Sequence, residues 1–200
     1  MFINARSWLI AVLPFVLAGC AGTNFVRPDP DSLKNGQMKY SEILDRFGAP
    51  RREGSLVKND KNVKTITYSY ASTVGTTRRE GVVPARGLTF LFLDEVLVGH
   101  EFISSWREDH TDFDGGRINQ ITKGQTNRTE VVALLGKPSG YYIYPLIAPT
   151  TGEAVVYSYA ELMQSEAELK RVRKVLIVTF DPRGIVIDIN YSASGDQPRQ

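Results

Sequence analysis

The chain repeats itself, and this repeat restricts the possible folds more than any other feature of the sequence. The segment beginning at Gly36 reads GQMKYSEILDRFGAP, and the segment beginning at Gly124 reads GQTNRTEVVALLGKP. The two align without a gap and lie 88 residues apart, the distance from Gly36 to Gly124. Two later blocks keep nearly the same spacing, the YSYA sequence and an apolar run that ends in aspartate. Three blocks in the same order indicate a duplicated structural unit.

A short helix is predicted in each copy. In the second copy, Val131, Leu134 and Leu135 lie at positions i, i+3 and i+4, which form one apolar face of a helix. Asn127 precedes Glu130 by three residues, the spacing of a capping box at a helix start. The first copy lacks such a capping residue, so the N-terminus of its helix should be less stable. A further helical turn is predicted ahead of each of these helices.

Three strands are predicted after the helix in each copy. The second strands, 88–93 and 175–180, are continuous apolar runs, which are typical of a central strand covered on both sides. The third strands are expected at 96–103 and 185–191. The first strand of each copy alternates between apolar and polar residues. Its apolar face carries Ile66, Tyr68 and Tyr70 in one copy and Val155, Tyr157 and Tyr159 in the other.

This order of elements predicts an α+β fold of two tandem α-α-β-β-β modules, in which the helices pack on antiparallel sheet. The modules are expected at 32–112 and 117–192, followed by a disordered tail at 193–200. The sequence leaves open whether the two modules share one sheet or form two.

The first residues have the pattern of a secretory signal that ends at a lipidation site. Arg6 supplies a positive charge, and an apolar run follows from Trp8 to Ala18. That run is too short for a bilayer, which takes about 20 residues to cross. The pattern closes at Cys20, the only cysteine of the chain, which directly follows the residues LAG. This arrangement resembles the bacterial lipobox.

The lipobox resemblance implies how the chain is processed and where it resides. Residues 1–19 would be a signal peptide that is removed, and Cys20 would carry the lipid. Residues 20–31 would form a lipidated tether, held extended by its prolines. Alanine rather than aspartate at position 21 implies the outer membrane. The folded part is therefore expected at its periplasmic face.

The helix motif, the lipobox and the order of elements together resemble the SmpA/OmlA (BamE-like) family of outer-membrane lipoproteins. The resemblance covers about 32–103 and 117–191. It implies a non-catalytic protein-interaction scaffold, in outer-membrane β-barrel protein assembly or envelope maintenance. Its expected partners are periplasmic or outer-membrane proteins, with the barrel-assembly machine among the candidates.

The tandem layout is similar instead to the β-lactamase inhibitory protein, and this similarity implies a different function. The alternative is an inhibitor or sensor of a periplasmic enzyme. It predicts a concave, exposed sheet face that is rich in aromatic residues. Tyr68 and Tyr70, or Tyr157 and Tyr159, would then face outward.

Composition and motifs give no indication of an enzyme. Without residues 1–19, which hold one arginine, 23 basic groups face 22 acidic groups, so no nucleic-acid partner is expected. The sequence contains no nucleophile elbow, phosphate loop or dinucleotide fingerprint. The two histidines are interpreted as a half-buried strand residue (His100) and part of an acidic loop (His110). We therefore expect no catalytic residue, metal or cofactor.

Candidate partner-binding residues are found in two segments. The apolar, tyrosine-rich segment 141–147 follows the second helix, whereas its counterpart 51–55 is polar. Aromatic residues are enriched in the cores of interfaces, but packing against the first copy, or an early first strand, would also explain this segment. Two residues of the N-terminal arm could dock on the domain or on the membrane. The candidates are Tyr141, Tyr142 and Tyr144, with Phe25 and Arg27 from the arm.

Overall fold

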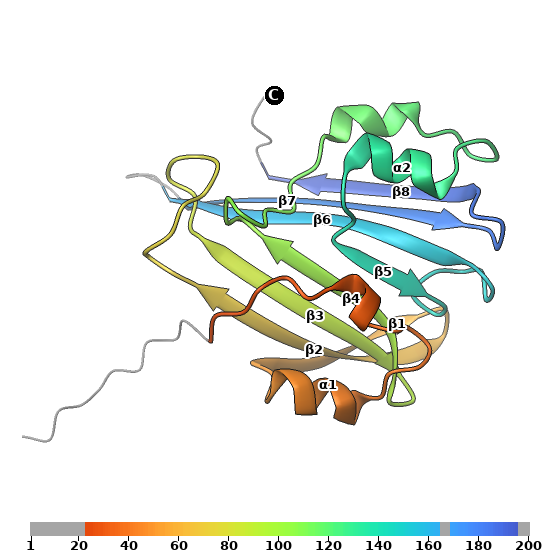
Figure 1. Cartoon of the computed structure of the whole chain (residues 1–200), viewed down its shortest axis with the longest axis horizontal. Helices are drawn as coiled ribbons and strands as arrows, with labels where there is room; N and C mark the ends of the chain where they lie inside the picture. Colours follow the sequence, from red (N-terminus) through yellow and green to blue (C-terminus); the bar gives the residue numbers. More distant parts are fainter. Residues whose placement is uncertain (1–22, 165–168, 196–200) are drawn as a thin grey trace, which may run out of the picture.

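A computed structural model describes residues 23–164 and 169–195, so the predicted signal peptide and Cys20 lie outside the described residues. The described chain forms one eight-stranded antiparallel sheet in which the strands follow one another in sequence order (Figure 1). The sheet curves into an open half-barrel. Its strands are β1 (Arg52–Lys58), β2 (Lys61–Ala71), β3 (Ala85–Leu93), β4 (Val96–Ser104), β5 (Gly140–Ile143), β6 (Glu153–Gln164), β7 (Leu169–Phe180) and β8 (Val186–Ser194).

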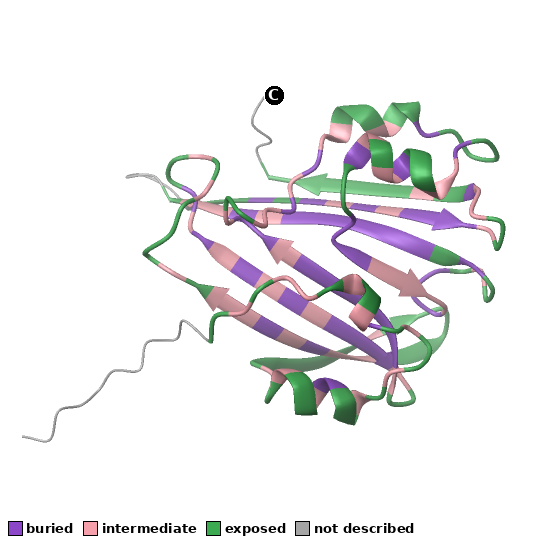
Figure 2. Ribbon diagram, in the orientation of Figure 1, coloured by how far each residue is buried: buried purple, intermediate pink, exposed green. Residues whose placement is uncertain are grey.

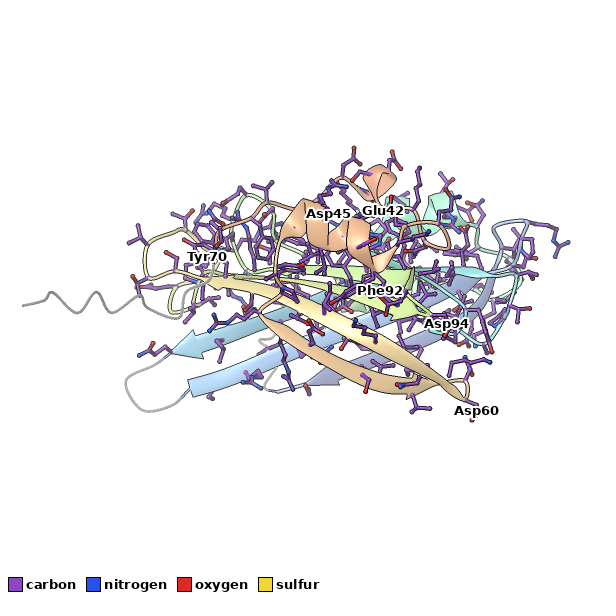
Figure 3. All side chains as sticks on the ribbon, turned by 90° about the horizontal axis from the view of Figure 1, so that it is seen from below. Glu42, Asp45, Asp60, Tyr70, Phe92 and Asp94 are labelled. Atoms are coloured by element: carbon purple, nitrogen blue, oxygen red, sulfur yellow. The ribbon has the colours of Figure 1, made fainter. Side chains whose placement is uncertain are left out.

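The helical segments pack on one face of this sheet, which we call the helix face (Figure 1). They are α1 (Tyr40–Phe47), α2 (Arg128–Leu135) and the 3-10 segments η1 (Pro30–Ser32) and η2 (Gly115–Gln120). Viewed from below, α1 lies on one side of the sheet, and β1 and β2 curl toward the other side (Figure 3). None of the described helices has the length and apolarity that crossing a bilayer requires.

Each copy builds its own core between its α-helix and the sheet. Buried and partly exposed residues alternate along the strands, so most buried apolar side chains lie on the helix face (Figure 2). A smaller buried cluster, which includes Leu91 and Leu146, lies on the other face. In the first copy Ile43 of α1 packs with Leu88 and Phe90, and in the second Val131 of α2 packs with Leu176. Burial of one such side chain stabilises the fold by about 1.5–3 kcal/mol.

The duplicated sequence makes duplicated contacts. The hydroxyl of Tyr68 donates a hydrogen bond to the carbonyl of Gly48 at the end of α1, at 2.7 Å. The hydroxyl of Tyr157 donates to the carbonyl of Gly136 at the end of α2, at 3.0 Å. In both copies a buried tyrosine therefore ties the end of the helix to the sheet.

The predicted α+β arrangement of two α-α-β-β-β modules is wrong. Each copy contributes one eight-residue α-helix and four strands, and all eight strands belong to one sheet. The helices predicted ahead of α1 and α2 are absent from the described residues, and the short 3-10 segments η1 and η2 take their place. The prediction also missed β1. This edge strand is almost wholly exposed, so its sequence lacks the apolar alternation by which strands are recognised.

Several local predictions are confirmed. Asn127 and Glu130 form the capping box of α2, whereas the side chain of Lys39 makes no capping hydrogen bond at α1. The predicted strands 88–93 and 96–103 leave two residues between them, as a tight hairpin turn requires, and Asp94 and Glu95 form this turn between β3 and β4. Both have positive φ, as hairpin turns of this length prefer. The second strands, however, are not covered on both sides along their length, because Thr89 in β3 is partly exposed on the face away from the helices. The predicted tail begins inside β8, which reaches Ser194, and residues 196–200 lie outside the described residues.

Candidate binding surface

The three candidate tyrosines lie where the two copies meet, but they do not form one surface. Tyr141 in β5 faces the helix side, with its ring centroid 5.6 Å from that of His100. Tyr142 faces the opposite side, and its hydroxyl donates a hydrogen bond to the carboxylate of Glu101 at 2.7 Å. Tyr144 is half-buried and follows β5. Tyr141 and Tyr142 therefore join the copies, and a role of these tyrosines in binding a partner stays a prediction.

The join between the copies, which we call the seam, is narrow and tight. It consists of three residue pairs between β4 and β5, and glycine occurs in two of them. A Cβ atom at Gly140 would lie 2.1 Å from the carbonyl oxygen of His100, and one at Gly99 would lie 2.3 Å from Cδ1 of Leu146. Both distances are far shorter than real contacts. The two strands therefore approach as closely as they do because neither glycine carries a side chain.

The N-terminal arm is docked across the helix face. The ring of Phe25 meets the ring of Phe102 edge-on, with centroids 6.4 Å apart. The guanidinium of Arg27 lies over the same ring and donates a hydrogen bond to the carbonyl of Pro138 in the second copy. Phe25 and Arg27 therefore dock on the domain. Docking on the domain and docking on the membrane were the two alternatives that the sequence left open. Contact with a partner through Phe25 or Arg27 stays a prediction.

His100 should make the stability of the fold sensitive to acid. It is 4% exposed, and burial, together with the positive charge of Arg27, lowers its pKa from 6.5 to about 4. The unfolded chain therefore binds the proton more tightly, so stability is complete above pH 6.5 and is lost as the pH falls toward 4. We expect His100 to account for a loss of roughly 2 kcal/mol between pH 7 and pH 5, measured by urea unfolding.

A variant separates this effect from general acid sensitivity. His100→Phe keeps a ring against Tyr141 and should flatten the dependence of unfolding free energy on pH. His110→Phe, at a more exposed histidine, should retain most of it. Equal pH dependence in the parent chain and in His100→Phe would show that His100 is not the responsible group.

The acidic residues around His110 are used in structural ion pairs. Asp109 accepts a hydrogen bond from Ser104 at 2.6 Å and pairs with Arg86 at 2.9 Å. Asp112 pairs with Lys174 at 2.6 Å. No group of three or more histidine, cysteine or acidic side chains converges as metal ligands within residues 23–164 and 169–195. These carboxylates thus fix the loop to the sheet.

The face of the sheet opposite the helices carries a groove, which we call the concave groove. Its volume is about 790 Å³, and residues of β1 to β7 line it, so it spans both copies. Small and polar residues such as Thr65, Thr67 and Gly87 form part of its floor. Its aliphatic residues are Leu56, Leu91, Ile103 and Leu162.

The charged groups at the concave groove are mainly basic. Arg52 lies on β1, and Arg171 and Arg173 lie on β7. Glu101 is a carboxylate in the middle of the sheet that faces the groove, and it accepts a hydrogen bond from Tyr142. The sequence did not identify this site, because a run of charged residues does not reveal which of them face the concave side.

The aromatic concave face predicted for an enzyme inhibitor is not found. Tyr68, Tyr157 and Tyr159 are buried on the helix face, in or beside the cores described above. Tyr70 stacks on Trp106 with ring centroids 6.1 Å apart. The expectation that these tyrosines face outward is therefore wrong, and an inhibitor built on this fold would have to use other residues.

Comparisons with known proteins leave the family of this chain open. No family model matches it, and no curated protein matches it, so the resemblance to the SmpA/OmlA family is unsupported. Among solved structures, it is similar to a protein of Streptococcus mutans described as a "putative beta-lactamase inhibitor protein". The TM-score is 0.41 at 9% identity, over 81% of this chain and 91% of that chain. This likeness agrees with the predicted similarity of layout, but at such a score it carries no argument about function.

Proposed function

We propose that the chain is a non-catalytic binding protein, held at the periplasmic face of the outer membrane by acylated Cys20. Its binding surface is the concave groove, which receives a protein partner. The observation that carries this proposal is the contrast between the two faces of the sheet. Helices and the arm cover one face, whereas the groove on the other crosses both copies and is uncovered in the described part of the chain.

The construction of the sheet suits it to binding. Backbone hydrogen bonds between all neighbouring strands hold the groove in shape, so little order has to be gained when a partner docks. A lipid anchor raises the local concentration of the protein at the membrane, which strengthens the capture of a partner there. A role in β-barrel assembly lacks support, because no family model matches the chain.

Crosslinking in living cells tests the proposed surface. A photoreactive amino acid is placed at Thr67 or Thr89 in the groove, and at the exposed Ser41 or Thr129 on the helices as matched controls. We expect the groove positions to capture a distinct partner that the helix positions do not. Capture from the helices alone would contradict the proposed surface. A captured periplasmic enzyme would identify the chain as an inhibitor or sensor of that enzyme.

Cys20→Ser tests the anchor in the same cells. Without the thiol no lipid is attached, so we expect the chain to move from the membrane fraction to the soluble periplasmic fraction. A reduced crosslink yield from Thr67 in this variant would show that anchoring promotes capture. A Cys20→Ser chain that stays with the membrane would contradict lipid anchoring at this residue.

A further inference from the structure

We infer that the partner docks through a carboxylate-rich segment, which the guanidinium groups of Arg52, Arg171 and Arg173 bind in the concave groove. This inference rests on the proposed function and adds the chemistry of the partner. The three arginines come from strands at opposite ends of the groove, β1 and β7. A segment lying across the sheet would therefore meet positive charge at both ends.

The strand register places these side chains in the groove. Arg52 pairs with Thr67, whose neighbour Tyr68 is buried on the helix face. Arg173 pairs with Ala160, and because side chains alternate along a strand, it points away from the next residue, Lys174. Lys174 is buried on the helix face, against the ring of Phe113. Arg171 lies two residues before Arg173 and so shares its side of the sheet.

The charge of the groove is not neutralised by the described part of the chain. Arg52, Arg171 and Arg173 are exposed, and none of them forms an ion pair with another described residue. The buried cations of the helix face, Arg86 and Lys174, do form ion pairs. The three groove arginines therefore remain available to carboxylates, which a guanidinium can bind with two parallel hydrogen bonds.

Glu101 does not cancel the positive charge of the groove. Its side chain accepts a hydrogen bond from the Tyr142 hydroxyl. The other described carboxylate at the groove, Glu161, is buried and pairs with Arg79. Burial, and then the charge of Glu101, raise the pKa of Tyr142 well above 10, so the hydroxyl keeps its proton and continues to donate. Three guanidinium groups against two partnered carboxylates leave the groove positive, and a concave wall concentrates that potential.

The groove fits an extended protein segment better than a single anion. Between the arginines lie partly exposed aliphatic side chains, including Ile103 and Leu162, which would contact apolar residues of a partner. The fitting segment thus carries acidic residues at its ends and alternates them with apolar residues. Electrostatic complementarity of this kind favours the correct partner and speeds its encounter.

Peptide binding to the lipidated, mature chain in detergent tests this chemistry. The probe is a short fluorescent peptide that alternates glutamate with leucine, and the matched peptide carries lysine in place of glutamate. We expect fluorescence anisotropy to show binding of the glutamate peptide alone, with affinity falling as salt is added. Arg173→Glu should weaken binding about tenfold or more, because it replaces a charge-assisted contact with repulsion.

Arg51→Glu is the matched control. Arg51 adjoins Arg52 in sequence, but it lies at the helix face beside Phe47 and Tyr68, so binding should be unchanged. Circular dichroism would confirm that each variant is folded. Equal binding of both peptides, or an equal loss in Arg51→Glu and Arg173→Glu, would overturn the inference.

The two proposals fail in different ways. Partner capture from Thr67 without binding of the glutamate peptide would keep the proposed surface and overturn its acidic chemistry. Peptide binding without any capture in cells would keep the chemistry of the groove and contradict its proposed function.

Discussion

Gly140→Ala is expected to lower the free energy of unfolding by about 3 kcal/mol, at the upper end of the cost of overpacking. The added Cβ would lie 2.1 Å from the carbonyl oxygen of His100 and 3.0 Å from Cα of Glu101. Both atoms belong to the backbone of β4, so no side chain can turn aside to make room. Relief of the clash requires β4 and β5 to move apart, and their three residue pairs join the strands of the two copies into one sheet.

Urea unfolding of the chain, followed by circular dichroism, measures this effect. Gly87→Ala is the matched control, because no atom lies within 4 Å of a Cβ built at that position in β3. Its free energy of unfolding should change by less than about 1 kcal/mol. If the copies separate in Gly140→Ala, unfolding should also become less cooperative, with a lower dependence on urea. Equal stability of the two variants would contradict a tight seam.

Arg86→Met and Lys174→Met should each lower the free energy of unfolding by about 3 kcal/mol, the cost of removing one partner from a buried ion pair. The two cations occupy equivalent positions in the two copies, 88 residues apart as in the repeated motif. Arg86 pairs with Asp109 at 2.9 Å, and Lys174 pairs with Asp112 at 2.6 Å. Methionine keeps much of the side-chain length but leaves these carboxylates without their cation.

Both cations hold the same connecting segment between the copies, so their effects should not add. Once one contact is lost, the segment is freer, and the second contact stabilises less. The double variant should therefore lose less than the sum of the two single losses in urea unfolding. Lys123→Met is the control, since its pair with Asp188 is exposed, and it should barely change stability. A similarly small effect of Arg86→Met would show that the buried pair is not structural.

The sequence predicted the elements whose cause is local. The capping box of α2 depends on residues three positions apart, and the turn at Asp94 and Glu95 connects adjacent strands. The predicted fold class was wrong because the fold depends on pairing between strands that lie far apart in the sequence. The seam requires Gly140 to lie against His100, and nothing near either residue in the sequence reveals that contact.

The candidate site was hidden for a related reason. Arg173 and Lys174 are neighbours in one basic run, yet one lies at the concave groove and the other is buried beneath Phe113. Successive side chains of a strand point to opposite faces of the sheet, so the two residues face opposite sides once the position of the strand is known. Tyr141 and Tyr142, in contrast, attracted notice as aromatic residues, and the structure uses them to join the copies.

A sheet that does not close into a barrel keeps two free edge strands. These edges decide whether neighbouring copies of the chain can pair with one another. β1 and β8 each have a single neighbouring strand, so their outer backbone groups could pair with another copy. β1 carries the exposed charges of Arg52, Glu53 and Lys58, and β8 begins with a register shift opposite Phe180 and exposes Asp188. Charges and bulges of this kind discourage edge-to-edge polymerisation. If the proposed lipid anchor holds many copies close together, the chains can thus stay dispersed and keep their grooves available.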